Sequence, residues 1–181
     1  MSAAPNRLPE LTGVAIERGF VTGAELESLH AWAEERFSEG HLIPNSNGKH
    51  RYYKSYDESD AEVPELFWQV RRRAVSAFAV ENYEDEPGFK CFLGCNLEGG
   101  TVHRHTDPSP PDKHHVRMNL MISKPLSGGD PVIDGKKFEV AEGDLWCFFP
   151  TVMPHESTPV VGKRKRIVIS IGILVPKLAA A

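Results

Sequence analysis

The chain has 181 residues, of which 40% are apolar, 9% aromatic and 25% charged. These values are typical of a soluble protein with one hydrophobic core, so we expect a single domain over residues 1–181. Three cysteines without a C-x-x-C pair argue against a disulfide scaffold and a structural zinc site. The longest nearly apolar run, 167–175, is about half of the roughly 20 residues that a membrane-spanning helix requires. The N-terminus has no apolar stretch of the kind found in secretion signals, so we expect a cytoplasmic protein without a membrane partner.

The formal net charge of -4 is unevenly distributed. Residues 1–100 carry 10 Lys and Arg against 17 Asp and Glu, whereas residues 101–181 carry 11 against 8. A mildly basic second half suits a small anionic ligand better than a nucleic-acid backbone, so no nucleic-acid partner is expected. The composition carries no signal for the oligomeric state.

The first half of the chain predicts two amphipathic helices. Thr22 to Glu25 has the form of a capping box, and apolar residues then recur at helical spacing up to Gly40. A second helix is expected to begin at Pro64. Between them, residues 40–60 are rich in Asn, Gly and Tyr and predict a long loop or a short irregular strand. We expect this segment to act as a lid that contacts the substrate through Tyr52 and Tyr53.

After Pro87-Gly88 the apolar periodicity changes from that of a helix to that of a strand. Asp134-Gly135 between apolar residues is a strong hairpin signal. Two helices followed by strands alone favour an antiparallel sandwich or barrel backed by helices. We therefore expect helical support and a lid over residues 1–88 and a double-stranded β-helix, or jelly roll, over 89–177. The expected strands lie near 89–97, 101–107, 116–122, 131–140, 144–149 and 166–175.

The stretch His103-Arg104-His105-Thr106-Asp107, with His155 beyond it, carries the strongest chemical signal. On a strand, residues two apart point to the same side, so His105 and Asp107 would present an imidazole and a carboxylate together. A histidine from a neighbouring strand would complete a set of two imidazoles and one carboxylate, which is the ligand set of non-haem Fe(II) oxygenases. The His-x-Asp spacing alone is common and usually marks a turn or a surface pair.

The last predicted strand has two different faces. Four isoleucines alternate along 167–173 and would pack on the N-terminal helices, whereas Arg166 and Ser170 lie on the opposite face with Val168 and Gly172. Residues 116–122 repeat the division, with apolar side chains opposing Arg117 and Asn119. A face that begins with arginine and continues with small or polar residues is suited to a ligand-holding interior.

In these residues the sequence resembles the iron(II)- and 2-oxoglutarate-dependent dioxygenases, whose signature is His-x-Asp, a distal His, and an Arg or Lys at the start of the final barrel strand. It is most similar to the aspartyl/asparaginyl β-hydroxylase branch, with the prolyl 4-hydroxylases as second neighbours. The resemblance covers residues 89–177. It implies that Fe(II) is bound by His105, Asp107 and His155, and that Arg166 binds the distal carboxylate of 2-oxoglutarate.

The resemblance also implies further contacts with 2-oxoglutarate, from Ser170, Arg117, Asn119 and Asn96. Asn96 is a departure from the prolyl hydroxylases, which have a tyrosine in its place. The implied reaction is hydroxylation of an unactivated C–H bond in an amino acid, a peptide or protein side chain or another small molecule, with dioxygen consumed and succinate and CO2 released. Arg104 and Arg117 near the mouth would suit an anionic substrate, and His103 is a further substrate candidate.

Three other classes stay open on the sequence alone. A cupin-type metal protein or isomerase would use His103, His105 and His155 without 2-oxoglutarate turnover, although the glutamate expected after His-x-His is absent. A metallo-β-lactamase-type hydrolase matches the run from His103 to Asp107 but fails at Pro108. A β-sandwich binding module would bind neither Fe(II) nor 2-oxoglutarate tightly.

Overall fold

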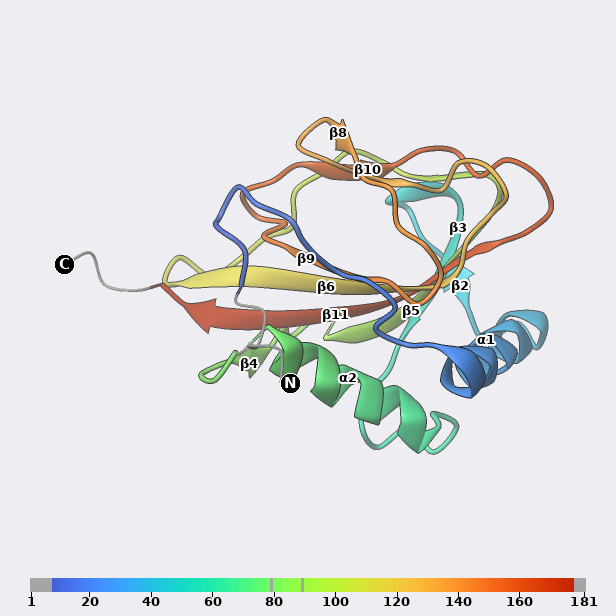
Figure 1. The fold of residues 1–181 in the computed structure, drawn as a ribbon, viewed down its shortest axis with the longest axis horizontal. Coiled ribbons are helices and arrows are strands. Elements are labelled where there is room, and N and C mark those ends of the chain that lie inside the picture. The colour runs from blue at the N-terminus through green and yellow to red at the C-terminus, as the bar shows by residue number, and fades with distance from the viewer. Residues whose placement is uncertain (1–7, 79, 89, 178–181) are drawn as a thin grey trace.

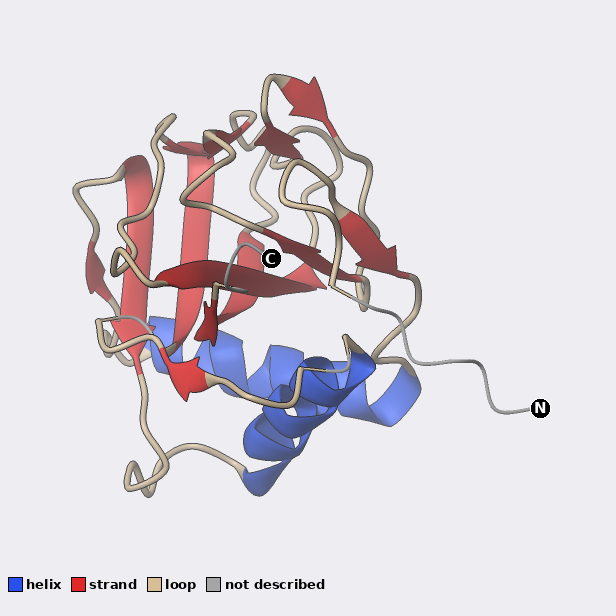
Figure 2. Cartoon of the chain, turned by 90° about the vertical axis from the view of Figure 1, so that its left-hand side faces the viewer, coloured by secondary structure: helices blue, strands red, loops and turns tan. Residues whose placement is uncertain are grey.

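The computed structural model describes residues 8–78, 80–88 and 90–177, and these residues form three layers (Figure 1). A three-stranded sheet lies over one face of an eight-stranded sheet, and two helices pack on the other face. Figure 2 shows both helices gathered on one side of the strands. The expected strand at 89–97 includes Phe89, which lies outside the described residues.

All strand pairs are antiparallel, as predicted for a jelly-roll arrangement. Along the large sheet the order is β1 (Ala15–Glu17), β9 (Leu145–Phe148), β6 (Lys113–Ser123), β11 (Arg166–Pro176), β5 (Cys91–Val102), β3 (Gly48–Ser55) and β2 (Ile43–Pro44), with β4 (Glu84–Asp85) also paired to β11. The small sheet has the order β10 (His155–Ser157), β7 (Pro131–Ile133) and β8 (Lys136–Lys137). The predicted mainly β class is confirmed. Among the described residues the strands form two facing sheets, and a fully closed barrel is not formed.

The helices are α1 (Gly23–Ser38) and α2 (Glu65–Ala77), close to the predicted positions. Thr22 lies at the start of α1 in an extended conformation, but its side chain makes no capping hydrogen bond, so the predicted capping box is not formed. No helix in the described part of the chain has both the length and the apolar character needed to cross a membrane.

The main hydrophobic core lies between the helices and the large sheet. The four isoleucines of β11 are buried there together with Leu29 of α1 and Phe67 of α2. Val116, Met118, Leu120 and Ile122 of β6 belong to the same core. The predicted division of both strands into an apolar face toward the helices and a polar face away from them is therefore confirmed. Because β6 and β11 are neighbours, their polar faces form one continuous surface that faces the small sheet.

Of the two alternatives predicted for 40–60, the long loop was wrong and the irregular strand is confirmed, although β3 is longer than expected, with eight residues that pair with β5 along most of their length. Arg51 and Tyr53 point away from the core, whereas Tyr52 packs against it. The Asn and Gly residues that indicated a loop lie at the start of β3, where a register shift between Lys49 and Arg51 accommodates His50 at a φ of 44°. β3 forms a wall of the site, and the role of the 40–60 segment as a lid stays a prediction.

The prediction of a strand over 101–107 was also wrong. β5 runs without interruption from Cys91 to Val102, and the chain then leaves the large sheet. Beyond this point His105 forms one isolated bridge with His155. The predicted hairpin is confirmed, since Asp134 and Gly135 connect β7 to β8 with φ values of 50° and 73°.

The core predicts the effect of a truncation in β11. Ile169 is fully buried between the large sheet and the helices, so Ile169→Ala should lower the free energy of unfolding by about 2–5 kcal/mol, measured by urea denaturation. Leu126→Ala is the control, because Leu126 is 91% exposed and its truncation should change stability by less than about 0.5 kcal/mol. Equal effects of the two substitutions would contradict this assignment of the core.

Candidate metal centre

Backbone hydrogen bonds bring together the residues of the predicted metal site. The His105 N–H donates to the His155 carbonyl at 3.1 Å, and the His155 N–H donates to the His105 carbonyl at 2.8 Å. Two residues later, the Asp107 N–H donates to the carbonyl of Pro150 at 3.0 Å. The segment after β5 is thereby attached to β10 and to the turn that precedes it. These bonds place the three side chains at the same point between the two sheets.

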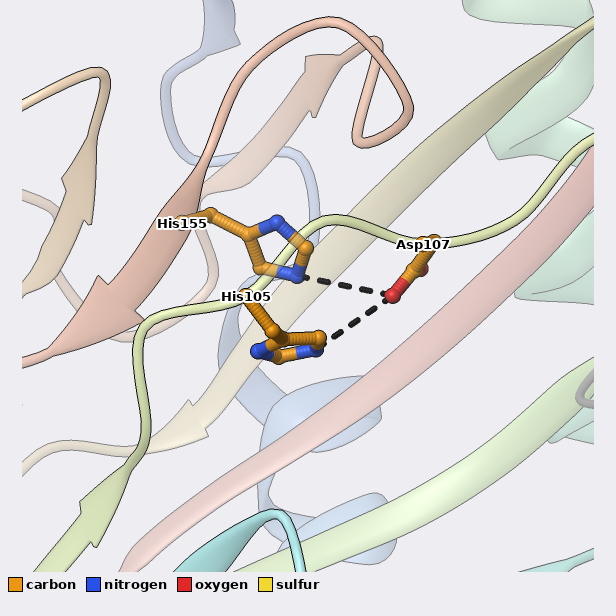
Figure 3. Close-up of side chains that lie close together, drawn as sticks. All are labelled: His105, Asp107 and His155. Carbon is orange, nitrogen blue, oxygen red and sulfur yellow. Dashed lines mark ion pairs between the residues drawn. The ribbon is translucent and has the colours of Figure 1, made fainter.

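The side chains of His105, Asp107 and His155 converge on one another (Figure 3). The Nε2 atoms of the two histidines lie 3.3 and 3.8 Å from Oδ1 of Asp107, and one ligand atom from each residue lies within 4.8 Å of the others. The imidazole rings are 4.2 Å apart between centroids and tilted by 50°. Such separations suit a single ion bound by all three residues.

The outer nitrogen of each ring faces a backbone carbonyl. Nδ1 of His105 lies 2.6 Å from the carbonyl oxygen of His103, and Nδ1 of His155 lies 3.4 Å from that of Met153. An N–H at Nδ1 donates to these carbonyls and leaves Nε2 of each ring as the atom that can bind a metal ion beside Asp107. Support of this kind fixes the tautomer and the orientation of metal-binding histidines.

The electrostatics favour an ionised carboxylate and a neutral imidazole. Nη2 of Arg117 donates to Oδ2 of Asp107 at 3.0 Å. Burial opposes ionisation of Asp107, but contact with His105 and the charge of Arg117 outweigh it and hold the pKa of this carboxyl well below its usual range. Burial lowers the pKa of His155 to about 4. The hydrogen-bonding contact with Asp107 raises the pKa of His105, and a bound metal ion would displace the proton that this contact stabilises.

This donor set is specific in its chemistry. Two imidazoles and one carboxylate on one side of an ion are the facial triad of non-haem Fe(II) oxygenases, which leaves further coordination positions open for other ligands. The remaining carboxylate oxygen of Asp107 is occupied by Arg117, so Asp107 has one oxygen available for the metal. The residues therefore fit a divalent ion that keeps open positions toward the cavity.

A cavity between the two sheets extends from the triad across the polar faces of β6 and β11. Its lining includes all five residues predicted to contact 2-oxoglutarate, namely Asn96, Arg117, Asn119, Arg166 and Ser170. Pro131 and Ile133 of the small sheet form the opposite wall. The structure thus brings the predicted metal ligands and the predicted cosubstrate residues into one site.

Three of these residues, Asn96, Ser170 and Arg166, have buried polar groups that could bind a ligand. Both polar side-chain atoms of Asn96 and the hydroxyl of Ser170 are buried and have no hydrogen-bond partner among the residues that the structure describes. Arg166 is buried and donates from Nε to the carbonyl of Gly129 at 2.8 Å. Burial lowers the pKa of Arg166 to about 10, so the guanidinium remains charged at neutral pH. Buried polar groups without partners are costly, which indicates that a polar, anionic ligand completes this end of the cavity.

Some of the residues predicted to contact substrate line the cavity, and others lie outside it. Tyr53 lines the cavity, but Tyr52 lies on the other face of β3 and packs edge-to-face on Phe37 with ring centroids 5.6 Å apart. Arg104 is exposed at the surface, where its Nη1 lies 3.6 Å from Oε1 of Glu156. His103 is also exposed. Strand alternation accounts for Tyr52, and the departure of the chain from the sheet after β5 accounts for the two residues next to His105.

Several cavity residues were not predicted from the sequence. The most important is Arg51, two positions before Tyr53 on the same face of β3. The alternation of Arg51 and Tyr53 was available as a signal, but the surrounding turn residues obscured it. Other lining residues that were not predicted include Asn45, Asn47, Trp146, Phe148 and Glu156.

No protein-family model matches the chain, and no curated protein does so. Solved structures do match. A prolyl-4-hydroxylase from Pseudomonas putida is 20% identical with a TM-score of 0.69, covering 92% of this chain and 94% of its own. HygX from Streptomyces hygroscopicus, solved with nickel, 2-oxoglutarate and hygromycin B, is 11% identical with a TM-score of 0.65, covering 91% and 83%. The non-heme alpha ketoglutarate dependent epimerase SnoN from nogalamycin biosynthesis is 10% identical with a TM-score of 0.69, covering 92% and 77%. At these identities the likeness is one of fold, and the fold agrees with the one that the sequence resemblance implies.

The geometry predicts which histidine matters for metal binding. His105→Ala, Asp107→Ala and His155→Ala should each weaken Mn(II) binding by more than the roughly 10–100-fold that loss of a supporting residue costs. His103→Ala is the matched control and should bind Mn(II) like the wild type, because only its carbonyl contacts the site. Isothermal titration calorimetry measures Mn(II) binding by the three variants and by the control. Loss of metal in His103→Ala with retention in Asp107→Ala would favour the cupin ligand set instead.

Proposed function

We propose that this protein is an Fe(II)- and 2-oxoglutarate-dependent oxygenase. The observation that carries the proposal is the triad of His105, Asp107 and His155 at one end of a cavity whose other end holds Arg166. A metal triad alone fits many activities. A buried guanidinium in the same cavity, beside polar atoms that lack partners, is what a chelating dicarboxylate requires.

Fe(II) would be held by Nε2 of His105, Nε2 of His155 and one carboxylate oxygen of Asp107. Iron bound there would supply the oxidative chemistry, in which dioxygen is activated as 2-oxoglutarate is converted to succinate and CO2. The chain provides the geometry for this reaction. Arg117 holds Asp107 ionised and restrains the rotation of its carboxylate, and the carbonyls behind the rings hold both imidazoles in position.

The cosubstrate would be oriented by the residues on β11, β5 and β6. Arg166 would pair with the distal carboxylate of 2-oxoglutarate, and the partnerless hydroxyl of Ser170 would donate a hydrogen bond to it. Asn96 lies directly opposite Arg166 in the β5–β11 register and would use its buried amide on the same ligand. Asn119, opposite Ser170 on β6, faces the same space.

The reaction we propose is hydroxylation of a C–H bond in an amino acid, a peptide or protein side chain or another small molecule. The resemblance to the aspartyl/asparaginyl and prolyl hydroxylases supports it, as does the similarity of fold to a prolyl-4-hydroxylase. HygX shows that the fold also accommodates hygromycin B together with 2-oxoglutarate. SnoN is an epimerase, so the placement of the substrate relative to the metal decides between hydroxylation and another oxidative outcome.

The cupin alternative loses support from the position of His103, whose side chain is exposed and absent from the converging group. Asp107 takes the third position instead. A binding module with incidental histidines does not account for the carbonyl support behind both rings or for the buried arginine.

Binding of 2-oxoglutarate should stabilise the protein. With Mn(II) present, 2-oxoglutarate at a hundred times its Kd should add about 2.7 kcal/mol to the free energy of unfolding, measured by thermal or chemical denaturation. Arg166→Met should abolish this increment, because it removes the cation that the distal carboxylate needs. An equal increment in the variant would remove Arg166 from the cosubstrate site, and no increment in the wild type would overturn the proposed function.

Turnover should depend on each member of the triad. His105→Ala, Asp107→Ala and His155→Ala should abolish succinate formation from 2-oxoglutarate under saturating Fe(II), because each removes one of three protein ligands. Chromatographic quantification of succinate measures this outcome. Retained turnover in any of the three variants would contradict the assignment of the metal site.

A further inference from the structure

Arg51 occupies a defined place in the cavity. On the large sheet, Arg51 of β3 lies opposite Asn96 of β5, and Asn96 lies opposite Arg166 of β11. The three side chains therefore form one row across three adjacent strands, and all of them line the cavity. The two arginines are on either side of the asparagine that we assign to the cosubstrate.

Three arginines line this cavity, and their partners differ. Arg117 contacts Asp107 at 3.0 Å. Arg166 and Arg51 are matched only with backbone carbonyls, those of Gly129 at 2.8 Å and Asn47 at 3.3 Å. Among the residues that the structure describes, no carboxylate lies within 4.0 Å of either guanidinium. The negative charges that favour these two cations, Asp107 for Arg51 and Asp130 for Arg166, therefore act without direct contact.

The charge on Arg51 is costly to the folded protein. Burial acts against ionisation and outweighs the favourable charge of Asp107, and the positive charge of Arg117 adds to the effect of burial, so the pKa of Arg51 falls to about 10. The group is still protonated at neutral pH. The charge of Arg51 in turn disfavours the charged form of Arg166. Retaining such a group is reasonable where a ligand supplies the missing negative charge.

2-Oxoglutarate has two carboxylates, and the proposed function already assigns a role to each of them. In the proposed function, one carboxylate of 2-oxoglutarate pairs with Arg166 and the other is directed to the triad. No carboxylate of the cosubstrate is then assigned to Arg51. It lies on the strand next to β5, with Tyr53 and the amides of Asn45 and Asn47 on the same side of the cavity.

We infer that Arg51 binds a carboxylate of the substrate, so that this oxygenase acts on a small carboxylic acid such as a free amino acid. The inference rests on the proposed function and specifies its substrate class. A single guanidinium matches one carboxylate in charge and in bidentate geometry, whereas a phosphate monoester carries nearly two charges and would need further cationic donors. The sequence indicated Arg104 and Arg117 for this role. Arg104 lies at the surface, and Arg117 contacts Asp107.

The test compares acids with their neutral analogues. Wild-type protein with Fe(II) and 2-oxoglutarate is supplied with each proteinogenic L-amino acid and with its primary amide, and stimulated succinate release is measured. The acids that stimulate release should do so with a KM about 10- to 100-fold lower than their amides, the loss expected for one charge-assisted contact. Arg51→Met should raise the KM for the acid to that for the amide, and Arg51→Lys should restore part of the difference. Arg72→Met, on the exposed surface of α2, is the matched control and should retain the difference between acid and amide.

A second measurement separates substrate binding from a structural role. Without ligands, Arg51→Met should melt at or above the temperature of the wild type, because it removes a partly buried cation that has no carboxylate in direct contact. A clear loss of melting temperature would make Arg51 a structural residue and overturn the inference.

The remaining outcomes identify which proposal fails. Amides that couple as well as acids, a panel in which no acid couples, or an unchanged acid preference in Arg51→Met would each overturn the inference about substrate. If Arg51→Met weakens 2-oxoglutarate binding as strongly as Arg166→Met, Arg51 belongs to the cosubstrate and the inference is also wrong. If the wild type with Mn(II) binds no 2-oxoglutarate, the proposed function itself fails.

Discussion

The two backbone hydrogen bonds between His105 and His155 are the constraint on which the site depends. They join a segment that has just left the large sheet to the first residue of β10 in the small sheet. Side chains far apart in the chain therefore meet without a dedicated loop. Asp107, attached two residues further on, receives the Arg117 guanidinium from β6, so both sheets contribute to a single group of ligands. The candidate metal centre therefore depends on the hydrogen bonds that join the two sheets as well as on its three side chains.

The rest of the cavity follows from strands with two unlike faces. On β6 and β11 the face toward the helices is apolar and fully buried, which provides the stability of the fold. The opposite face carries Arg117, Asn119, Arg166 and Ser170. Within the described part of the chain, the buried hydroxyl of Ser170 and the buried amide of Asn96 on neighbouring β5 have no hydrogen-bond partner, which is unfavourable. The helices and the large sheet thus stabilise a scaffold that holds an energetically costly polar interior. Ligands that bring negative charge and hydrogen-bond acceptors reduce that cost, so binding and stability should be linked.

Much of this arrangement was predictable from alternation and spacing. Isoleucines at every second position of β11 indicated the buried face, and the same pattern placed Arg166 and Ser170 in the interior. The convergence of His105, Asp107 and His155 was correctly expected, but for a partly wrong reason, because the segment holding the first two is bound by isolated hydrogen bonds and is not a regular strand. The full length of β3 was not predicted because Asn and Gly at its irregular start resemble a loop, and Arg51 was missed with it. Arg51 lies in the first half of the chain, which is acidic overall, so the charge distribution did not indicate that this half also contributes a cation to the cavity.

The central claim is that one cavity holds a metal ion at the triad and 2-oxoglutarate at Arg166. A crystal structure of the protein with Mn(II) and 2-oxoglutarate under anaerobic conditions tests it most directly. The account predicts the ion on His105, Asp107 and His155, and the distal carboxylate of 2-oxoglutarate on Arg166, with Arg51 left facing open space in the cavity. An ion bound through His103, or 2-oxoglutarate held by Arg51 with Arg166 unoccupied, would contradict it.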